Sequence, residues 1–88
     1  MSYSKEQLDQ IFSKGTPVRG KDPNLYRKDI CDNEIYRHSY GKDSIMGWNV
    51  DHKNPISKGG TNSPKNLQPL QSSTNKSKGN TYPYRCKK

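Results

Sequence analysis

The hydrophobic positions at the start of the chain predict a short amphipathic helix. Its apolar face consists of Leu8, Ile11 and Phe12. Their i, i+3, i+4 spacing places them on one side of a helix. Ser4 and Gln7 match a capping box in front of this face, and Gly15 suits the helix end. Residues 16–24 contain two prolines, a glycine and alternating charges, which predicts a loop.

Two stretches of alternating side chains predict a β-hairpin in the next part of the chain. Residues 25–30 form the first stretch and residues 34–37 the second, and the turn-forming pair Asp32 and Asn33 lies between them. Residues 39–47 hold two glycines and have no regular period, so we expect an irregular excursion there.

A second pair of strands and a helix are predicted in the C-terminal half. Residues 48–52 have the pattern of an extended strand, and residues 66–70 form a short return strand that Pro69 is expected to end. The long turn between them is rich in proline and glycine. A helix over residues 72–78 is predicted because it begins with serines and a threonine, which are favoured N-caps, and Gly79 suits its end.

Composition limits the chain to one small domain with a thin core. Only twelve of the 88 residues are Leu, Ile, Val or Phe, and six tyrosines and Trp48 add amphipathic aromatic area. Low apolar content with high net charge is also typical of a disordered basic protein, which is one reading of this chain. We expect a folded centre, stabilised further by a bound ion or polyanion, and loose ends.

The charge balance points to a polyanionic partner. Sixteen Lys and Arg residues against eight Asp and Glu residues give a formal net charge of +8. Such a charge attracts nucleic acid, and the attraction weakens steeply with salt. The alternative is that the lysines only solvate a small surface. The chemistry of the motif must decide between these readings.

The two cysteines do not form a metal-binding pattern. Cys31 and Cys86 are far apart and neither belongs to a CxxC pair, so we expect no structural zinc. We expect ordinary thiols; the alternative is a disulfide that ties the C-terminal tail to the Cys31 turn in an oxidising compartment. No apolar run approaches the ~20 residues of a membrane span, and the first residues are too polar for a signal peptide. The expectation is a soluble intracellular, cytoplasmic protein with no membrane partner.

A carboxylate, an imidazole and an amide in the C-terminal half suit metal-assisted cleavage of a phosphodiester. Asp51 can supply an anionic oxygen ligand, and Asn75 an amide oxygen from the last helix. These ligands favour one Mg²⁺ or Mn²⁺ ion over zinc. His52 is then free to act as general base, since an ordinary histidine is largely neutral near pH 7. Adjacent residues face opposite sides of a regular strand, so Asp51 and His52 can serve one phosphate only if the strand ends or twists there.

Further features surround this group: Gly47-Trp48 before Asp51-His52, then Pro55, Lys58-Gly59-Gly60, Asn66 to Leu70 and Asn75 to Gly79. With them, the stretch from Trp48 to Asn80 resembles the HNH endonuclease family. The resemblance implies a ββα-metal fold, in which two strands and a helix hold one divalent ion. This chain has Asn75 where many members have a histidine and Asp51 where some have one, which argues for oxygen ligation and against tight zinc binding. The cysteine pairs that bind a structural zinc in some members are absent.

The resemblance assigns a role to each residue of the motif. It implies that Asp51 and Asn75 are metal ligands and that His52 is the general base that activates water. Asn66 would be the central asparagine, which holds the loop between the strands and so orients His52 rather than touching the metal. A turn-capping asparagine would predict almost the same contacts.

Basic residues around the motif are the expected nucleic-acid contacts. They are Arg37, Lys42, Lys53, Lys58, Lys76 and Lys78. Lys78 lies three residues after Asn75 and so shares its helical face, from which it could reach a neighbouring phosphate. The alternative is that the helix lysines are solvated and favour the helix dipole. Arg37 could bind a phosphate with two parallel hydrogen bonds.

The sequence thus predicts an α+β fold, namely a small ββα-metal (HNH) domain with an N-terminal helix and an additional β-hairpin. The expected parts of this single domain, residues 1–88, are a helix and loop (1–24), a hairpin and excursion (25–47), the ββα-metal motif (48–80) and a basic flexible tail (81–88).

The predicted function is a metal-dependent endonuclease. The expected substrate is double-stranded DNA, with RNA left open, and the enzyme is expected to have low sequence specificity or to cut one strand. The alternative is a non-catalytic DNA-binding or packaging protein on the same scaffold. Monomer and dimer are not distinguished, and a phage or viral origin is an expectation by analogy with other small proteins of this kind.

Overall fold

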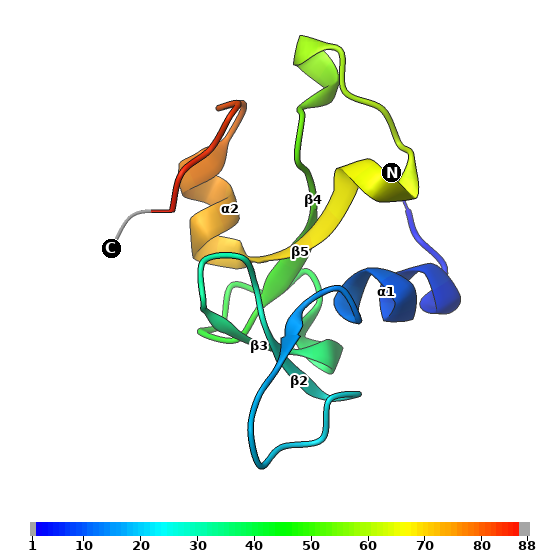
Figure 1. The fold of residues 1–88 in the computed structure, drawn as a ribbon, viewed down its shortest axis with the longest axis vertical. Helices are drawn as coiled ribbons and strands as arrows, with labels where there is room; N and C mark the ends of the chain where they lie inside the picture. The colour runs from blue at the N-terminus through cyan, green and yellow to red at the C-terminus, as the bar shows by residue number, and fades with distance from the viewer. Residues whose placement is uncertain (1, 87–88) are drawn as a thin grey trace.

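Two helices and five strands form the described part of the chain, residues 2–86 of a computed structural model (Figure 1). In chain order they are α1 (Lys5–Phe12), β1 (Thr16–Pro17), β2 (Tyr26–Lys28), β3 (Glu34–Tyr36), β4 (Trp48–His52), β5 (Leu67–Gln71) and α2 (Ser72–Lys78). Short 3₁₀ turns lie at Arg37–Ser39, Ile56–Lys58 and Pro64–Asn66. The predicted α+β fold is confirmed, with two small antiparallel sheets.

Helix α1 begins at the predicted capping box. The Ser4 hydroxyl accepts a hydrogen bond from the Gln7 backbone N–H at 3.1 Å, and the Gln7 side chain accepts one from the Ser4 N–H at 2.8 Å. These reciprocal bonds satisfy N–H groups that the first helical turn leaves without partners. The helix buries Ile11 and Phe12.

The N-terminal sheet has the strand order β1-β2-β3, and the predicted hairpin forms its β2 and β3. The predicted loop is wrong at its start, because Thr16 and Pro17 pair with β2 as an edge strand. Proline lacks an N–H and is tolerated at a sheet edge. The Arg27 side chain holds this edge by donating to the carbonyls of Ser13 and Gly15, each at 3.0 Å.

The second sheet consists of β4 and β5, paired from Trp48 opposite Gln71 to His52 opposite Leu67. Pro69 lies inside β5 and does not end it, contrary to the prediction. A proline fits a two-stranded sheet where its missing N–H would face away from the partner strand. Helix α2 follows immediately, and Gln71 rather than a serine or threonine takes the N-cap position.

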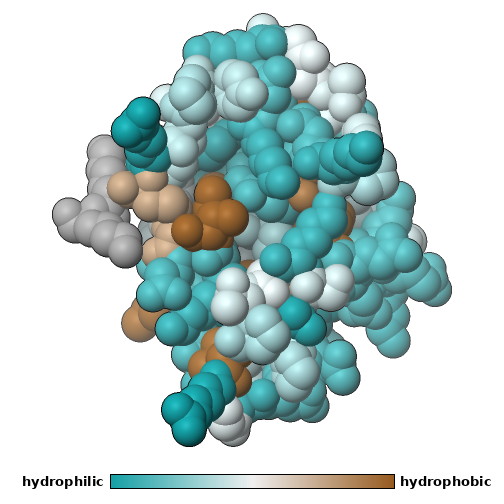
Figure 2. All heavy atoms as spheres, in the orientation of Figure 1, coloured by the Kyte–Doolittle hydropathy of each residue, from teal (hydrophilic) through white to brown (hydrophobic). Residues whose placement is uncertain are grey.

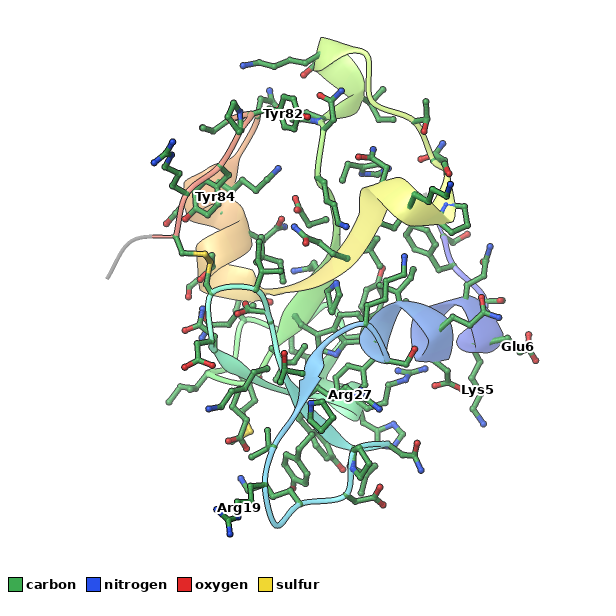
Figure 3. All side chains as sticks on the ribbon, viewed as in Figure 1. Lys5, Glu6, Arg19, Arg27, Tyr82 and Tyr84 are labelled. Atoms are coloured by element: carbon green, nitrogen blue, oxygen red, sulfur yellow. A yellow bond between two sulfur atoms is a disulfide. The ribbon has the colours of Figure 1, made fainter. Side chains whose placement is uncertain are left out.

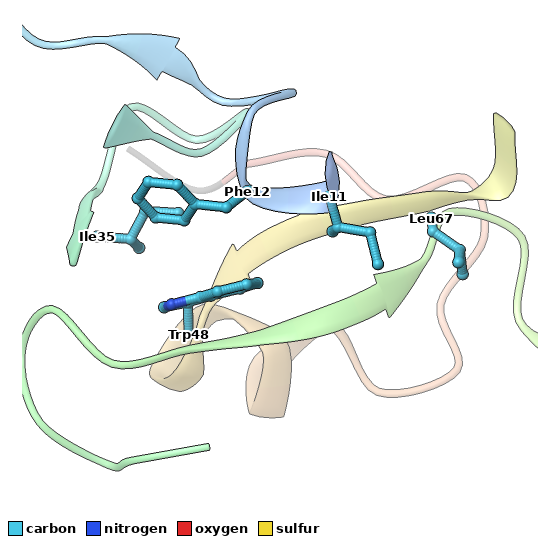
Figure 4. Packing of buried hydrophobic residues seen from close by; sticks show 5 residues of the cluster. All are labelled: Ile11, Phe12, Ile35, Trp48 and Leu67. Atoms are coloured by element: carbon cyan, nitrogen blue, oxygen red, sulfur yellow. The ribbon is translucent and has the colours of Figure 1, made fainter. Parts of the chain in front are cut away.

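The hydrophobic core joins the two halves of the chain. Its buried members are Ile11, Phe12, Ile35, Trp48 and Leu67 (Figure 4). Trp48 is completely buried, and its ring centroid lies 5.3 Å from that of Phe12. Helix α1 covers one face of the β4–β5 sheet and α2 covers the other (Figures 1 and 4). The sheet that carries the motif is therefore fixed by packing against the N-terminal half.

The interior is small and strongly polar. Among residues 2–86, six aliphatic or aromatic residues are buried, and so are six polar or charged ones: Asp29, Arg37, Asp51, Gln68, Ser72 and Lys78. The surface is hydrophilic over most of the face in Figure 2, with apolar residues in scattered spots. Because so few apolar side chains are available, hydrogen bonds and ion pairs must position much of this fold.

Asp29 shows how such a buried carboxylate connects elements. One of its oxygens accepts the backbone N–H groups of Cys31 and Asn33, each at 2.9 Å. The other accepts the Gln71 N–H at 2.8 Å, where β5 passes into α2. Asn33 also donates to the Thr74 hydroxyl at 3.1 Å. The hairpin turn is thereby attached to the start of α2.

A disulfide joins Cys31 to Cys86, so the expected free thiols are wrong and the alternative of a disulfide to the tail holds (Figure 3). The two Cα atoms are 5.4 Å apart. The hairpin turn lies beside α2, so the segment that follows α2 can return to Cys31. This neighbourhood depends on tertiary packing and could not be read from the spacing of the cysteines. Residues 87 and 88 of the predicted tail lie outside the described residues.

Within residues 2–86, no helix combines the length and the apolar character needed to cross a membrane.

Candidate active site

The residues of the motif meet in an open hollow of about 550 Å³. Asp51 and His52 line it from the end of β4, and Asn75 lines it from α2. Strand β4 ends at His52, which is the condition under which two adjacent residues can serve one site. The turn after β4 contributes Pro55, Ile56 and Ser57 to the wall.

Asp51 is held by two side chains in the floor of the hollow. One carboxylate oxygen lies 3.0 Å from the Lys78 ammonium, and the other accepts a hydrogen bond from the Gln68 amide at 2.8 Å. Asp51 is 5% exposed and Lys78 is 3% exposed. Lys78 also donates to the carbonyl oxygen of His52 at 3.0 Å. The last turn of α2 is thus joined to the end of β4.

His52 is half-buried, and one of its ring nitrogens has a partner. Its Nε2 atom lies 2.7 Å from the Oδ1 atom of Asn62. An amide oxygen only accepts hydrogen bonds, so this contact places the proton of a neutral ring on Nε2. The lone pair is then on Nδ1, which is the state that a general base requires.

Asn66 closes the loop that carries Asn62. Its side chain donates to the carbonyls of Asn54 at 3.0 Å and Thr61 at 2.7 Å, and accepts the Asn54 N–H at 2.8 Å. All three bonds lie within the segment between β4 and β5. Asn66 thus ties together the two ends of the loop, beside His52 at Asn54 and beside Asn62 at Thr61.

Four of the six predicted nucleic-acid contacts are exposed: Lys42, Lys53, Lys58 and Lys76. Lys76 forms an ion pair with Asp43 at 2.9 Å in which both side chains are mostly exposed. Such a surface pair contributes little to stability and leaves the lysine accessible to another anion.

The other two predicted contacts, Arg37 and Lys78, lie in the interior. The Arg37 Nε atom donates to Asp9 at 2.6 Å, and its guanidinium lies 6.0 Å from the centre of the Trp48 ring. Its carbonyl accepts the Trp48 Nε1–H at 3.2 Å. These contacts hold α1 against β4 and keep the Arg37 guanidinium away from the surface. Lys78 is buried in its pair with Asp51, so neither side chain is exposed to a DNA phosphate.

A second group of lysines lines a small cavity of about 110 Å³ between the segment that follows α1, the end of β2 and β5. These lysines are Lys14, Lys28 and Lys53. Lys14 donates to the carbonyl of Leu67 at 2.9 Å and to that of Pro64. Burial lowers the pKa of the Lys14 ammonium, and the charge of Lys53 lowers it further. The Lys14 side chain thus supports the start of β5.

Sequence reasoning missed Asn62, Gln68 and the internal role of Lys78. Gln68 stands directly opposite Asp51 in the β4–β5 register, so a predicted pairing of the two strands could have identified it. Asn62 lies in a polar turn without any period, and the sequence there gives no comparable signal.

Two side chains of the hollow could serve as ligands of a divalent ion. Asp51 and Asn75 provide hard oxygen donors from two elements, and each carboxylate oxygen retains a lone pair beside its hydrogen bond. Within residues 2–86, no group of three or more His, Cys, Asp and Glu side chains could hold a metal ion. Water and substrate oxygens would have to complete the coordination shell.

Comparison with known proteins identifies one family. A family model described as HNH endonuclease matches residues 30–81, which is more than half of the chain. The match includes β4, β5 and α2 and therefore Asp51, His52, Asn66 and Asn75. No curated protein and no solved structure matches the chain.

Proposed function

Because the chain belongs to the HNH endonuclease family, we propose that it is a metal-dependent endonuclease that hydrolyses phosphodiester bonds of DNA. The observation that carries this proposal is the shared hollow of Asp51, His52 and Asn75. A base beside two oxygen donors has no purpose in a protein that only binds DNA, whereas hydrolysis requires all three.

In the proposed reaction, His52 accepts a proton from the attacking water at Nδ1. Asn62 keeps the opposite nitrogen protonated and so holds the ring in the required tautomer and orientation. Asn66 acts as a positioning residue, because it fixes the loop on which Asn62 stands. Asp51 and Asn75 hold the divalent ion, which when bound supplies charge neutralisation at the phosphate and the leaving oxygen.

The exposed lysines are proposed to bind the phosphates on either side of the cleaved bond. Lys53 and Lys58 lie on the segment after β4, and Lys76 lies one residue after Asn75 in α2. Contacts to phosphates position the duplex without reading its sequence. Helix α2 has only seven residues and presents its Asn75 side to the hollow, so we propose low sequence specificity and cleavage of one strand per site.

The proposal is tested by nicking of supercoiled plasmid with Mg²⁺, Mn²⁺ or EDTA at low salt. Wild type is expected to nick only with the metal. His52→Ala is expected to bind DNA normally and to nick about 10²–10⁴-fold more slowly. His38→Ala is the matched control, because His38 is the second histidine and is exposed outside the hollow.

If purified wild type binds DNA with a steep salt dependence but cuts neither DNA nor RNA, the alternative of a DNA-binding or packaging protein replaces this proposal. If His52→Ala cuts as fast as wild type, the assignment of the general base is wrong.

A further inference from the structure

The hollow contains a balanced pair of opposite charges. Of the residues among 2–86 that line it, Asp51 is the only one with a carboxylate. The Lys78 ammonium, 3.0 Å away and almost fully buried, neutralises that charge. Asn75 is neutral, so these three side chains together have no net negative charge.

A divalent cation that enters the free protein therefore gains little from electrostatics. Buried charges interact through a medium that screens them much less than water does, so the repulsion from Lys78 offsets much of the attraction to Asp51. The overall charge of +8 adds further repulsion. A phosphodiester bound in the hollow brings one negative charge and two non-bridging oxygens to the metal site.

We propose that Lys78 keeps the metal affinity of the free protein low, so that the divalent ion binds together with the substrate phosphate. This inference rests on the proposed nuclease function and specifies the order in which its site is assembled. The phosphate supplies the negative charge that Lys78 removes from Asp51. Metal and DNA then each raise the affinity for the other by the same factor.

A purely structural role for Lys78 predicts the opposite sign. Its bonds to Asp51 and to the His52 carbonyl could serve only to fix the metal ligand. In that case, loss of Lys78 would loosen Asp51 and weaken metal binding. If Lys78 sets the charge, its loss strengthens metal binding to the free protein.

The first experiment measures Mn²⁺ binding to the free protein by titration calorimetry or by the spectroscopic signal of unbound Mn²⁺. Lys78→Met is expected to bind Mn²⁺ about tenfold more tightly than wild type, because it removes a unit charge close to the ion. Lys76→Met is the matched control. It changes the net charge equally, but Lys76 is exposed and paired with Asp43, so affinity is expected to change less than about twofold. Unchanged or weaker binding by a folded Lys78→Met protein overturns the proposal.

A second experiment uses variants that retain Lys78, in case Lys78→Met does not fold. His52→Ala keeps both metal ligands and should not cut, so its affinity for a short DNA duplex can be measured by fluorescence anisotropy with and without Mn²⁺ at constant ionic strength. The expected result is at least about tenfold tighter DNA binding with Mn²⁺, and loss of this effect on adding Asp51→Asn. Added divalent ions alone would weaken DNA binding by competing for phosphates.

No tightening, together with tight Mn²⁺ binding to the free protein, overturns the inference. Nicking by wild type in the same preparation would show that the proposed function stands even then. Tightening without any nicking by wild type would contradict the proposed function and leave the coupled binding intact.

Discussion

Reduction of the Cys31–Cys86 disulfide is expected to lower the free energy of unfolding by about 4 kcal/mol. The two cysteines are separated by 55 residues in the sequence. In the chain-entropy treatment, a closed loop of this length removes about 14 cal/mol/K from the unfolded state, which is about 4 kcal/mol at 25 °C. A domain of 88 residues is stable by roughly 4–13 kcal/mol in total, so the disulfide accounts for a large part of that stability.

The assay is urea unfolding of the oxidised protein, the reduced protein and Cys86→Ser. Trp48 is the only tryptophan and is completely buried in the core, so its fluorescence reports the loss of packing directly. The reduced wild type and Cys86→Ser are expected to unfold at similarly low urea concentrations. Cys86→Ser is also the control for the reductant, which should leave its unfolding curve unchanged.

One result would refute this reasoning. If thiol titration finds no free thiol in the oxidised protein, yet its unfolding midpoint equals that of the reduced protein, the loop closure contributes nothing. Residual structure that keeps Cys86 close to Cys31 in the reduced unfolded chain would give that outcome, because the disulfide then removes no further conformational entropy from the unfolded state.

Three further predictions concern the polar contacts of the interior. Asn66→Ala is expected to lower the nicking rate at least about tenfold, because it removes three hydrogen bonds of the loop beside His52. Asn66→Asp should nick at a rate between those of wild type and Asn66→Ala. Equal nicking rates for wild type and both variants would contradict the positioning role of Asn66. Arg37→Met is expected to lower the free energy of unfolding, measured by thermal melts, by about 2 kcal/mol and to leave DNA affinity nearly unchanged. A large loss of DNA affinity in the folded variant would show that Arg37 contacts phosphate after all. Asp29→Asn is expected to lower the free energy of unfolding by about 1–3 kcal/mol in urea titrations, since an amide group would face the Gln71 N–H. An unchanged free energy of unfolding would speak against that contact.

Elements governed by local patterns were predictable from the sequence. The capping box of Ser4 and Gln7 begins α1 as predicted, and β4 has the predicted bounds. Both signals depend on residues within a few positions of each other. The pairing of Thr16 with β2 and the return of Cys86 to Cys31 depend on contacts between distant segments, and no periodicity encodes them.

The residues that line the hollow were predictable from the sequence, but the contacts that support them were not. Asp51, His52 and Asn75 do line one hollow, as the resemblance implied. The positions of Arg37 and Lys78 were not foreseen, because both residue types are usually exposed and a buried one needs a specific partner. That partner is a carboxylate in each case, the exposed Asp9 for Arg37 and the buried Asp51 for Lys78, and the sequence does not show these pairings.

The packing of Trp48 has a consequence for transplanting this unit. Its indole is enclosed by the N-terminal half, in contact with Phe12 and in one cluster with Ile35, while Asp29 holds the start of α2 from the hairpin turn. A peptide of residues 48–80 would keep every proposed reactive group and lose these supports. A designer who grafts the β4–β5–α2 unit onto another protein must therefore also supply apolar side chains that enclose Trp48 and a carboxylate that accepts the backbone N–H at the start of α2.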